Sequence, residues 1–429
     1  MAILGNIFWF LVLFTIIVVA HEFGHFATAK LLGIGVETFS LGFGPRLVGF
    51  KRRETDYRIS MIPLGGYVKL MGEEKGSGDP REFMSRPRWQ KFLVLVMGPV
   101  MNVLVAVAVM TGVYMAGLQE PAFYSQPVIV GWVEPGSPAD KAGIHKGDRI
   151  ILIDGKKNPT WRDLKVIIST NAGNSVRVIL ERNGRKVETT LIPQKVGKYS
   201  LGYSGIYVPA EPVIGMILPG KPAQRAGLKP GDRILEVNGE RVEDFYHLRE
   251  LINNSQGKEL VLKIERKGRV LELRVKPERI NGRWILGFLP YQPAVKKQYP
   301  FFTALVSSVK DNIYYTTMTF DVLAKLIAGK LSPRTLSGPL DIAQFSYATA
   351  AAGMIPFLSF LAFVSLQLAI INLLPIPGLD GGQIIILLIE ALIGRELSER
   401  AKDWILKLGF SIIILLSIFV LLNDILKRL

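Results

Sequence analysis

Four apolar runs constrain this 429-residue chain more than any other feature of its sequence. They lie at residues 3–20 (with a continuation to about 32), 92–118, 355–374 and 404–422. A helix needs about 20 apolar residues to cross the hydrocarbon core of a bilayer, and only a helix or a closed barrel pairs all its backbone groups there. The first run lacks the basic flank of a cleavable signal peptide, so we expect it to be retained. The runs predict a multi-pass α-helical membrane protein with four transmembrane helices.

Charge supports a membrane rather than a nucleic-acid partner. The formal net charge is +16, but Lys and Arg are spread along the chain and flank the apolar runs, and no nucleic-acid-binding motif is present. Eleven basic residues lie between the first two runs, so that loop is expected on the cytoplasmic side, with both termini and the long middle segment outside. Cysteine is absent, which excludes disulfides and thiol chemistry.

The polar middle segment repeats itself. The stretch G-W-V-E-P-G-S-P-A from Gly131 matches G-M-I-L-P-G-K-P-A from Gly215, and an A-G-x-x-x-G-D-R-I pattern follows in both copies. Each copy next has a helical stretch, at residues 161–170 and 244–254, and then two strands joined at Asn183-Gly184 or Lys267-Gly268. An Asn-Gly pair between alternating strands is a strong hairpin signal.

This repeat resembles a tandem pair of circularly permuted bacterial PDZ domains, which implies two inserted extracytoplasmic modules of α+β, β-barrel-like form. The resemblance places peptide-binding loops at Gly202, Gly205 and Gly287. Domains of this kind bind an extended peptide as an added strand. The alternative, that these glycines only form turns and that the modules act as a steric filter, stays open.

The sequence therefore divides into nine segments. Three of them are neither spans nor modules. The stretch after the first span is strand-like in part, the one after the repeat has helical apolar spacing and lies along the membrane surface or on the second module, and the one between the last two spans is a turn with a cytoplasmic segment. The predicted segments are 1–32 (first span), 33–91 (hairpin and loop), 92–118 (second span), 126–209 and 210–290 (the modules), 300–345 (amphipathic helical segment), 353–376 (third span), 377–402 (turn and cytoplasmic segment) and 403–425 (fourth span).

The first span carries an H-E-x-x-H motif at His21, Glu22 and His25. Residues i and i+4 share one face of a helix, so two imidazoles can reach one metal ion while the Glu meets a water at the metal. Ionisable groups within a spanning helix cost about 2.5–3.5 kcal/mol each on insertion scales, so they persist where they have partners and a role. A buried His–Glu pair or a proton relay is the alternative.

A third ligand has to come from another segment, because catalytic zinc usually takes three protein ligands and keeps one position for water. The third span ends in N-x-x-P-x-P-G-L-D-G-G, from Asn372 to Gly382. Such a broken helix is tolerated at membrane depth only where it is buried in protein or lines a cavity. Asp380 lies at the break, and its alternative role is an N-cap for the helix that follows.

Together, H-E-x-x-H in the first span and N-x-x-P-x-x-x-L-D-G in a late span resemble the site-2 protease family of intramembrane metalloproteases. The tandem modules narrow the resemblance to the bacterial regulator of sigma-E type, and it covers essentially the whole chain. It implies one Zn²⁺ per chain held by His21, His25 and Asp380, with Glu22 as general base. It implies a zinc metalloendopeptidase (EC 3.4.24 type).

The resemblance also extends to substrate binding. Asn372 and Pro375 are candidates for holding an unwound substrate backbone, and Gly42 and Gly44 belong to the expected membrane-dipping hairpin. Asn102, in G-P-V-M-N near the start of the second span, is a further candidate. For Asn372 and Asn102 an interhelical hydrogen bond is the alternative, and for the hairpin a plain cytoplasmic loop.

The implied substrates are single-pass transmembrane proteins, such as an anti-sigma factor trimmed by an upstream site-1 protease, and remnant signal peptides. The implied location is the bacterial inner (cytoplasmic) membrane, with the active site toward the cytoplasm and the modules in the periplasm. Two other readings remain: a membrane-anchored peptide receptor with an inert metal site, and a transporter, because broken helices also mark ion sites.

Overall fold

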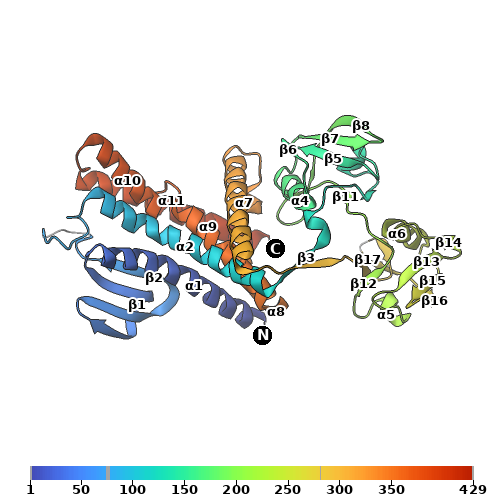
Figure 1. Cartoon of the computed structure of the whole chain (residues 1–429), viewed down its shortest axis with the longest axis horizontal. Helices are drawn as coiled ribbons and strands as arrows, with labels where there is room; N and C mark the ends of the chain where they lie inside the picture. Colours follow the sequence, from blue (N-terminus) through green and yellow to red (C-terminus); the bar gives the residue numbers. More distant parts are fainter. Residues whose placement is uncertain (1, 74–77, 281, 428–429) are drawn as a thin grey trace. The chain divides into compact units, whose positions relative to one another are not determined.

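The four predicted spans are present in the computed structural model, which describes residues 2–73, 78–280 and 282–427. Helices α1 (Ala2–Leu31), α2 (Arg88–Ala116), α9 (Met354–Asn372) and α11 (Glu399–Leu426) are each long and apolar enough to cross a membrane. They are drawn in dark blue, cyan, orange and red in Figure 1. The parts of the predicted segments at residues 1, 74–77 and 281 lie outside the described residues.

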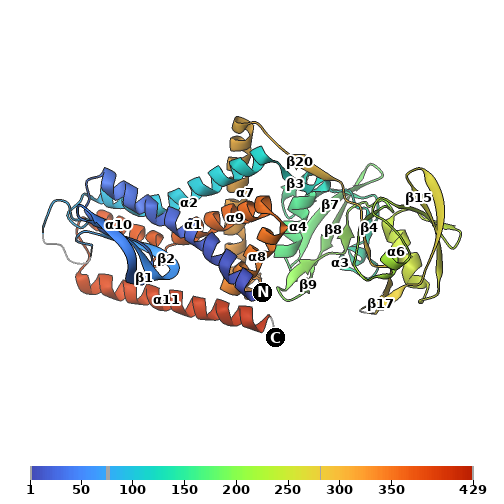
Figure 2. The same ribbon diagram turned by 90° about the horizontal axis from the view of Figure 1, so that it is seen from below.

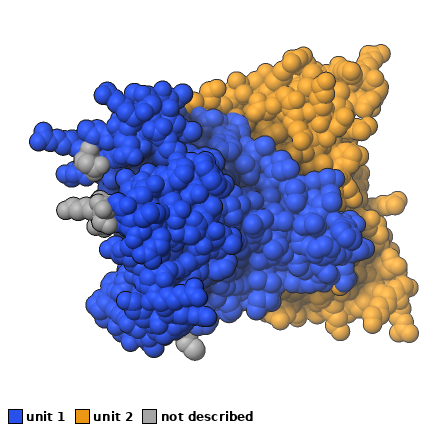
Figure 3. Space-filling view, turned by 60° about the vertical axis from the view of Figure 1, so that its left-hand side comes forward, with its two compact units in different colours: residues 1–118, 297–327, 333–429 blue, residues 119–296, 328–332 orange. Residues whose placement is uncertain are grey.

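The chain forms two compact units, coloured separately in Figure 3. We call them the helical unit (residues 1–118, 297–327 and 333–429) and the repeat unit (residues 119–296 and 328–332).

The helical unit is built around α2, which contacts α1, α9 and two further helices, α7 (Phe301–Ile327) and α10 (Asp380–Ile393). Leu13 and Ile17 of α1 are buried against Phe357 and Leu361 of α9. Helix α8 (Pro339–Ala352) packs on α1 and α9. These packed apolar faces fix the orientation of α1, which carries the two histidines.

Two predicted segments have to be corrected. Residues 300–345 were expected to form one amphipathic segment on the membrane surface or the second module, but α7 packs instead on α2 and α9, and Ser308 Oγ donates to the carbonyl of Val107 (2.8 Å). The segment then breaks at residues 328–338, before α8. Residues 377–402 were expected to be a turn and a cytoplasmic segment, but most of this stretch is helix α10, whose apolar face packs on α2.

The predicted hairpin is confirmed and is more folded than expected. Strands β1 (Val36–Arg52) and β2 (Thr55–Leu70) both bend, so that Thr38 pairs with Asp56 on one side and with Lys69 on the other. Gly42 and Gly44 have φ of 86° and 89° where β1 bends. The two bent strands therefore pair as four antiparallel stretches in one sheet. Residues 66–70 form one edge of this sheet and residues 46–52 form the other edge.

The repeat unit contains the predicted duplication. Two four-stranded sheets have the same order, β6-β5-β7-β8 and β14-β13-β15-β16, and each surrounds its own apolar core. Their strands are β5 (Arg149–Ile153), β6 (Lys156–Lys157), β7 (Val176–Arg182), β8 (Arg185–Leu191), β13 (Arg233–Val237), β14 (Glu240–Arg241), β15 (Leu260–Arg266) and β16 (Arg269–Val275). We call the half of the unit around the first sheet the first copy and the half around the second sheet the second copy.

The expected turns and helices of the copies are confirmed. Asn183 and Gly184 have φ of 49° and 75°, and Lys267 and Gly268 have φ of 51° and 76°, as a tight hairpin requires. Helices α4 (Trp161–Thr170) and α6 (Phe245–Asn254) lie in the predicted stretches; Asp244 is the N-cap of α6.

Short elements complete the repeat unit, as Figure 2 shows from below. Strands β3 (Leu118–Pro121) and β20 (Ala294–Lys297) pair with each other where the chain leaves and returns. The others are η1 (Ala122–Ser125), β4 (Trp132–Val133), α3 (Pro138–Lys141), β9 (Gln194–Val196), β10 (Leu201–Tyr203), β11 (Ile206–Tyr207), β12 (Ile214–Ile217), α5 (Pro222–Arg225), β17 (Glu278–Ile280), β18 (Arg283–Ile285) and β19 (Phe288–Pro290); η2 (Pro333–Thr335) belongs to the helical unit.

Candidate metal centre

The three predicted metal ligands meet in the helical unit. His21 and His25 project from one face of α1, and their Nε2 atoms are 3.2 Å apart. Asp380, the first residue of α10, places Oδ2 3.1 Å from His21 Nε2 and Oδ1 3.5 Å from His25 Nε2. One donor atom from each residue lies within 4.8 Å of the other two. The two motifs, separated by more than 350 residues in the sequence, thus converge on one point.

Glycines allow the helices to come this close. A Cβ on Gly98 of α2 would overlap His25 Nε2 and lie 2.8 Å from His21 Cε1. A Cβ on Gly24 of α1 would overlap the carbonyl of Met97. Gly381 and Gly382 lie equally tightly against the backbone of residues 373–377, which folds the start of α10 back toward α1.

The alternative role of Asp380 as a helix cap is wrong. Asp380 lies inside the first turn of α10; the N-cap position is taken by Leu379, and no side chain caps this helix. The Asp380 carboxylate instead faces the histidines, and its buried Oδ2 lies 3.1 Å from His21 Nε2. Two imidazole nitrogens and one carboxylate are the donor set of a catalytic zinc site, so these residues fit a zinc ion.

A cavity of about 310 Å³ opens at the three ligands, and Glu22 lines it. Glu22 faces strand β2: a Cβ built on Gly66 would lie 3.5 Å from Glu22 Cγ. Tyr67 and Val68 belong to the sheet edge formed by residues 66–70, so this edge borders the cavity. The other lining residues are Leu70, Glu73, Phe83, Val94, Leu95, Asn372, Gly378, Leu379 and Gln383.

The candidate substrate-binding residues differ in how close they lie to the cavity. Asn372 lines the cavity, with its Nδ2 3.3 Å from His21 Nε2. Asn102 is buried beside His21 Nδ1. Pro375, Gly42 and Gly44 are outside the residues that line the cavity.

The loop glycines of the two copies have local packing roles. A Cβ on Gly202 would overlap the carbonyl of Ile168 in α4. Gly205 and Gly287 have φ of 81° and 83°, and a Cβ on either would overlap the N-cap residue of a short helix, Ser137 or Lys221. These positions need glycine whether or not a peptide binds.

Sequence reasoning missed two kinds of site residue. The carbonyl of Val94, which accepts a hydrogen bond from His25 Nδ1 (2.8 Å), is a backbone group with no sequence signature. Glu73 and Gln383 line the cavity but belong to no motif. The only available signal was Gly98-Pro99, which marks where α2 lies closest to the histidines.

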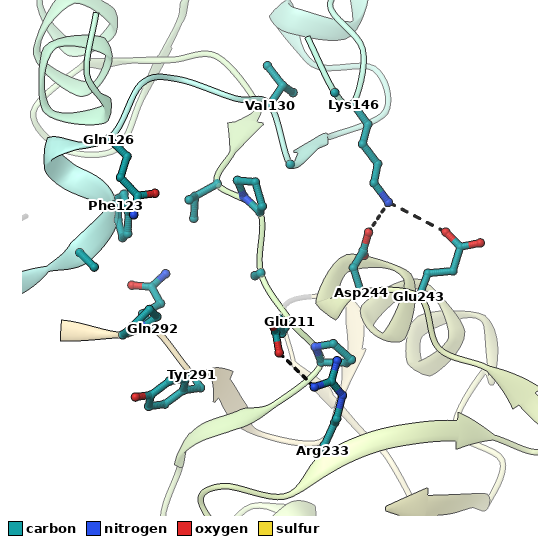
Figure 4. A pocket seen from close by; sticks show the side chains of 18 residues that line it. Phe123, Gln126, Val130, Lys146, Glu211, Arg233, Glu243, Asp244, Tyr291 and Gln292 are labelled. Atoms are coloured by element: carbon teal, nitrogen blue, oxygen red, sulfur yellow. Dashed lines mark hydrogen bonds and ion pairs between the residues drawn. The ribbon is translucent and has the colours of Figure 1, made fainter. Parts of the chain in front are cut away.

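A larger cavity of about 630 Å³ lies between the two copies of the repeat unit (Figure 4). Its charged side chains are paired with one another: Lys146 Nζ lies 2.5 Å from Asp244 Oδ2, and Arg233 Nη1 lies 3.2 Å from Glu211 Oε2. Phe123 and Tyr291 lie on its wall. Among the residues that the structure describes, the His21, His25 and Asp380 group of the helical unit is the one metal-ligand set, and none of its members lines this cavity.

Comparison with known proteins agrees with this geometry. The sequence matches peptidase family M50 over residues 9–416. It is 32% identical to the regulator of sigma E protease of Haemophilus influenzae over the full length of both chains, and 33% identical to regulator of sigma-E protease RseP of Escherichia coli, with 97% of each chain covered. It is 32% identical to a putative zinc metalloprotease of Vibrio cholerae, with 98% of each covered. The chain therefore belongs to peptidase family M50, the site-2 proteases.

Proposed function

We propose that this protein is a zinc-dependent endopeptidase that hydrolyses peptide bonds in the transmembrane segments of single-pass membrane proteins. Family membership makes it a protease with zinc as its cofactor. The observation that carries the finer proposal is the meeting of His21, His25 and Asp380 at a cavity lined by Glu22, with both histidines on a helix apolar enough to cross a membrane.

In this proposal His21 Nε2, His25 Nε2 and the Asp380 carboxylate hold the zinc. Bound zinc would polarise the scissile carbonyl and make a water molecule easier to deprotonate. Glu22, beside these ligands in the same cavity, would accept the proton of the attacking water and deliver it to the leaving amine.

A substrate helix must unwind at this site, because its amides are already paired. The sheet edge at residues 66–70 borders the cavity, and no further strand pairs with it among the described residues, so an unwound substrate could add there as a strand. Asn372 would bind the exposed backbone of the substrate beside the ligands. The bend at Gly42 and Gly44 shapes the sheet that carries this edge.

We assign the repeat unit as two PDZ domains, at residues 126–209 and 210–290, that control which proteins reach the metal site. Two functions remain for them: binding the new C-terminus left by an upstream site-1 protease, or excluding bulky ectodomains. The matching sheet order and the glycine loops at Gly205 and Gly287 support the PDZ assignment.

The protein is assigned to the inner membrane of a bacterium, with the metal site toward the cytoplasm and the PDZ domains in the periplasm. The basic loop between α1 and α2 supports this orientation. The Haemophilus and Escherichia relatives are named regulator of sigma E protease, and the substrate that we propose for this protein is a trimmed anti-sigma factor. Remnant signal peptides are a second substrate class of the same chemistry.

The test compares wild type with Glu22→Gln, a change that keeps the side-chain volume and removes the base. Both are purified in detergent and measured for bound zinc and for cleavage of a single-pass substrate without its ectodomain. We expect about one zinc in each, and a fall in cleavage of about 10²–10⁴-fold in Glu22→Gln.

Two results would contradict the proposal. A wild-type protein that holds zinc yet cuts no substrate with a weakened helix would favour a peptide receptor. A wild-type protein without metal would overturn the roles of His21, His25 and Asp380.

A further inference from the structure

Asn102 is a buried polar residue that the proposed mechanism leaves without a role. It lies on α2 and is fully buried. Its Nδ2 is 3.4 Å from His21 Nδ1, and its Oδ1 has no hydrogen-bond partner. A buried amide oxygen without a donor costs about 1–3 kcal/mol, so its surroundings need an explanation.

Helix α2 presents one stripe to both histidines. Val94, Gly98 and Asn102 are spaced by four residues and so share one face of α2. The Val94 carbonyl accepts from His25 Nδ1 at 2.8 Å, the absence of a side chain at Gly98 leaves room for both rings, and Asn102 reaches His21 Nδ1. Each histidine of α1 therefore has its own partner on this stripe of α2: Val94 for His25 and Asn102 for His21.

The protonation of His21 decides what Asn102 can do. His21 Nε2 is the ring atom that faces Asp380 and His25 Nε2, so it is the atom available to a metal. A neutral imidazole whose Nε2 is unprotonated carries its proton on Nδ1, which is then a donor. The Nδ1–H of His21 then faces the Nδ2 of Asn102, which is also a donor.

Rotating the Asn102 amide by 180° resolves this contact. The oxygen and nitrogen of an amide have nearly the same shape, and their assignment follows from the hydrogen bonds. After rotation, Oδ1 faces the His21 Nδ1–H and gains a donor. The present separation of 3.4 Å is long for a hydrogen bond, and an N–H···O bond at this contact would be about 2.9 Å long.

We propose that Asn102 is a positioning residue of the metal centre: its Oδ1 accepts a hydrogen bond from His21 Nδ1–H and fixes the tautomer and ring orientation that present Nε2 to the metal. Val94 does the same for His25 through its backbone carbonyl. Partners of this kind orient metal-bound histidines in general, and their loss typically weakens metal binding about 10–100-fold. This inference rests on the proposed role of His21 as a ligand.

A purely structural role for Asn102 is the competing explanation. Its backbone carbonyl accepts a hydrogen bond from Ser365 Oγ of α9 (2.9 Å), and Ser365 is fully buried. Ser365→Ala therefore disturbs the same α2–α9 contact without touching the amide or His21, which makes it the matched control.

The test uses full-length protein in detergent with wild type, Asn102→Leu, Asn102→Asp and Ser365→Ala. Asp keeps an acceptor oxygen but removes the amide donor, and Leu removes both. Each protein is loaded with zinc, and the rate of metal transfer to a chelator is measured. The cobalt-substituted forms give an absorption spectrum that reports the ligand geometry without any substrate.

We expect Asn102→Leu to lose metal about 10–100-fold faster than wild type and to change the cobalt spectrum. Asn102→Asp should stay within about threefold of wild type, and Ser365→Ala should match wild type in both measurements. Equal loss in Asn102→Asp and Asn102→Leu would overturn the acceptor role, as would wild-type behaviour of Asn102→Leu. If wild type itself binds no metal, the proposed function fails with it, and that result is visible in the wild-type sample alone.

Discussion

The two copies of the repeat unit share their internal contacts and differ in what covers them. In the first copy Arg182 donates to both oxygens of Asp148 at 2.7 Å and to the carbonyl of Gly143. In the second copy Arg266 does the same to Asp232, at the same 2.7 Å distances, and to Gly227. Both aspartates are buried. The duplicated sequence thus preserves one buried ion pair in each copy, which joins a strand end to the A-G-x-x-x-G-D loop.

The two copies differ in their contacts at two matching positions on helices α4 and α6. On α4, Arg162 donates to Glu120 (2.7 Å) and Lys165 Nζ lies 3.1 Å from the Tyr124 hydroxyl, so the segment before the first copy covers this helix.

On α6 the matching residues are Tyr246 and Arg249. Tyr246 stacks on Trp132 (5.1 Å, 3°) and donates to the Val208 carbonyl (2.7 Å), while Arg249 lies 4.4 Å over the same Trp132 ring. The first copy therefore covers the second. The two copies therefore share their interior contacts, whereas one face of the helix in each copy packs against the part of the chain that precedes it.

The largest expected effect comes from breaking one internal ion pair. Asp148→Asn should lower the stability of the first copy by about 2–3 kcal/mol, because Arg182 loses its charged partner while remaining partly buried. Hydrogen exchange in the full-length protein would show faster exchange in β5 and β7. Asp232→Asn is the matched variant and should act on β13 and β15. If either variant loosens both copies equally, the copies do not hold their cores independently.

Opening the joint between the copies is expected to have the next largest effect. Trp132→Ala removes the stack on Tyr246 and the contact with Arg249, at a cost of about 1–2 kcal/mol. A double-mutant cycle with Tyr246→Ala, read by hydrogen exchange in α6, should give a coupling of about 0.5–1.5 kcal/mol.

The same variant separates the two functions proposed for the PDZ pair. If the pair excludes bulky ectodomains, Trp132→Ala should speed cleavage of an untrimmed substrate and leave a trimmed one unchanged. If the pair recruits new C-termini instead, cleavage of the trimmed substrate should fall.

Acid should affect the first copy through Asp148. Burial raises the pKa of Asp148, but the hydrogen bonds from Arg182 and the His145 N–H outweigh burial and hold that pKa below its usual value. A carboxylate with a lowered pKa stabilises the fold above its unfolded pKa of about 3.9, and this stability is lost as the pH falls through the folded pKa. Protection of β5 and β7 should therefore decline below about pH 4, by at most about 1.4 kcal/mol per pH unit. Asp148→Asn should remove this part of the dependence; an unchanged profile would contradict it.

The smallest effect is expected from Lys146, which links the copies through Asp244 (2.5 Å) but is more than half exposed. Lys146→Ala should cost about 0.5 kcal/mol, and less as salt is added. Asp244→Ala serves as a contrast, because Asp244 also caps α6 by accepting from the N–H groups of Tyr246 and His247. A loss in Lys146→Ala that does not change with salt would mean that packing, rather than charge, is what Lys146 contributes.

The elements with a local signature could be predicted from sequence. The spans follow from apolar length, and the hairpin at Asn183-Gly184 follows from a residue pair that tolerates positive φ at both turn positions. The extent of helix α10 was missed because Pro375, Pro377 and Gly378 before it indicate a break, and Gly381 and Gly382 lie within its first turn. The double pairing of Thr38 was missed because strand register has no local signal.

The same distinction holds for the metal centre. His21, Glu22 and His25 are predictable because one helix face sets their spacing, and Asp380 because a broken helix needs a reason. The Val94 carbonyl and the acceptor face of Asn102 depend on how α2 packs against α1, which no single segment encodes.

The pairing of β3 with β20 has a consequence for how such proteins can be assembled from parts. The chain enters and leaves the repeat unit on two neighbouring strands, so about 170 residues are inserted between ends that already meet. Insertions with adjacent ends can be exchanged without stretching the host. The repeat unit is therefore a cassette: a short turn between β3 and β20 could replace it, and a different recognition module with similarly spaced ends could take its place.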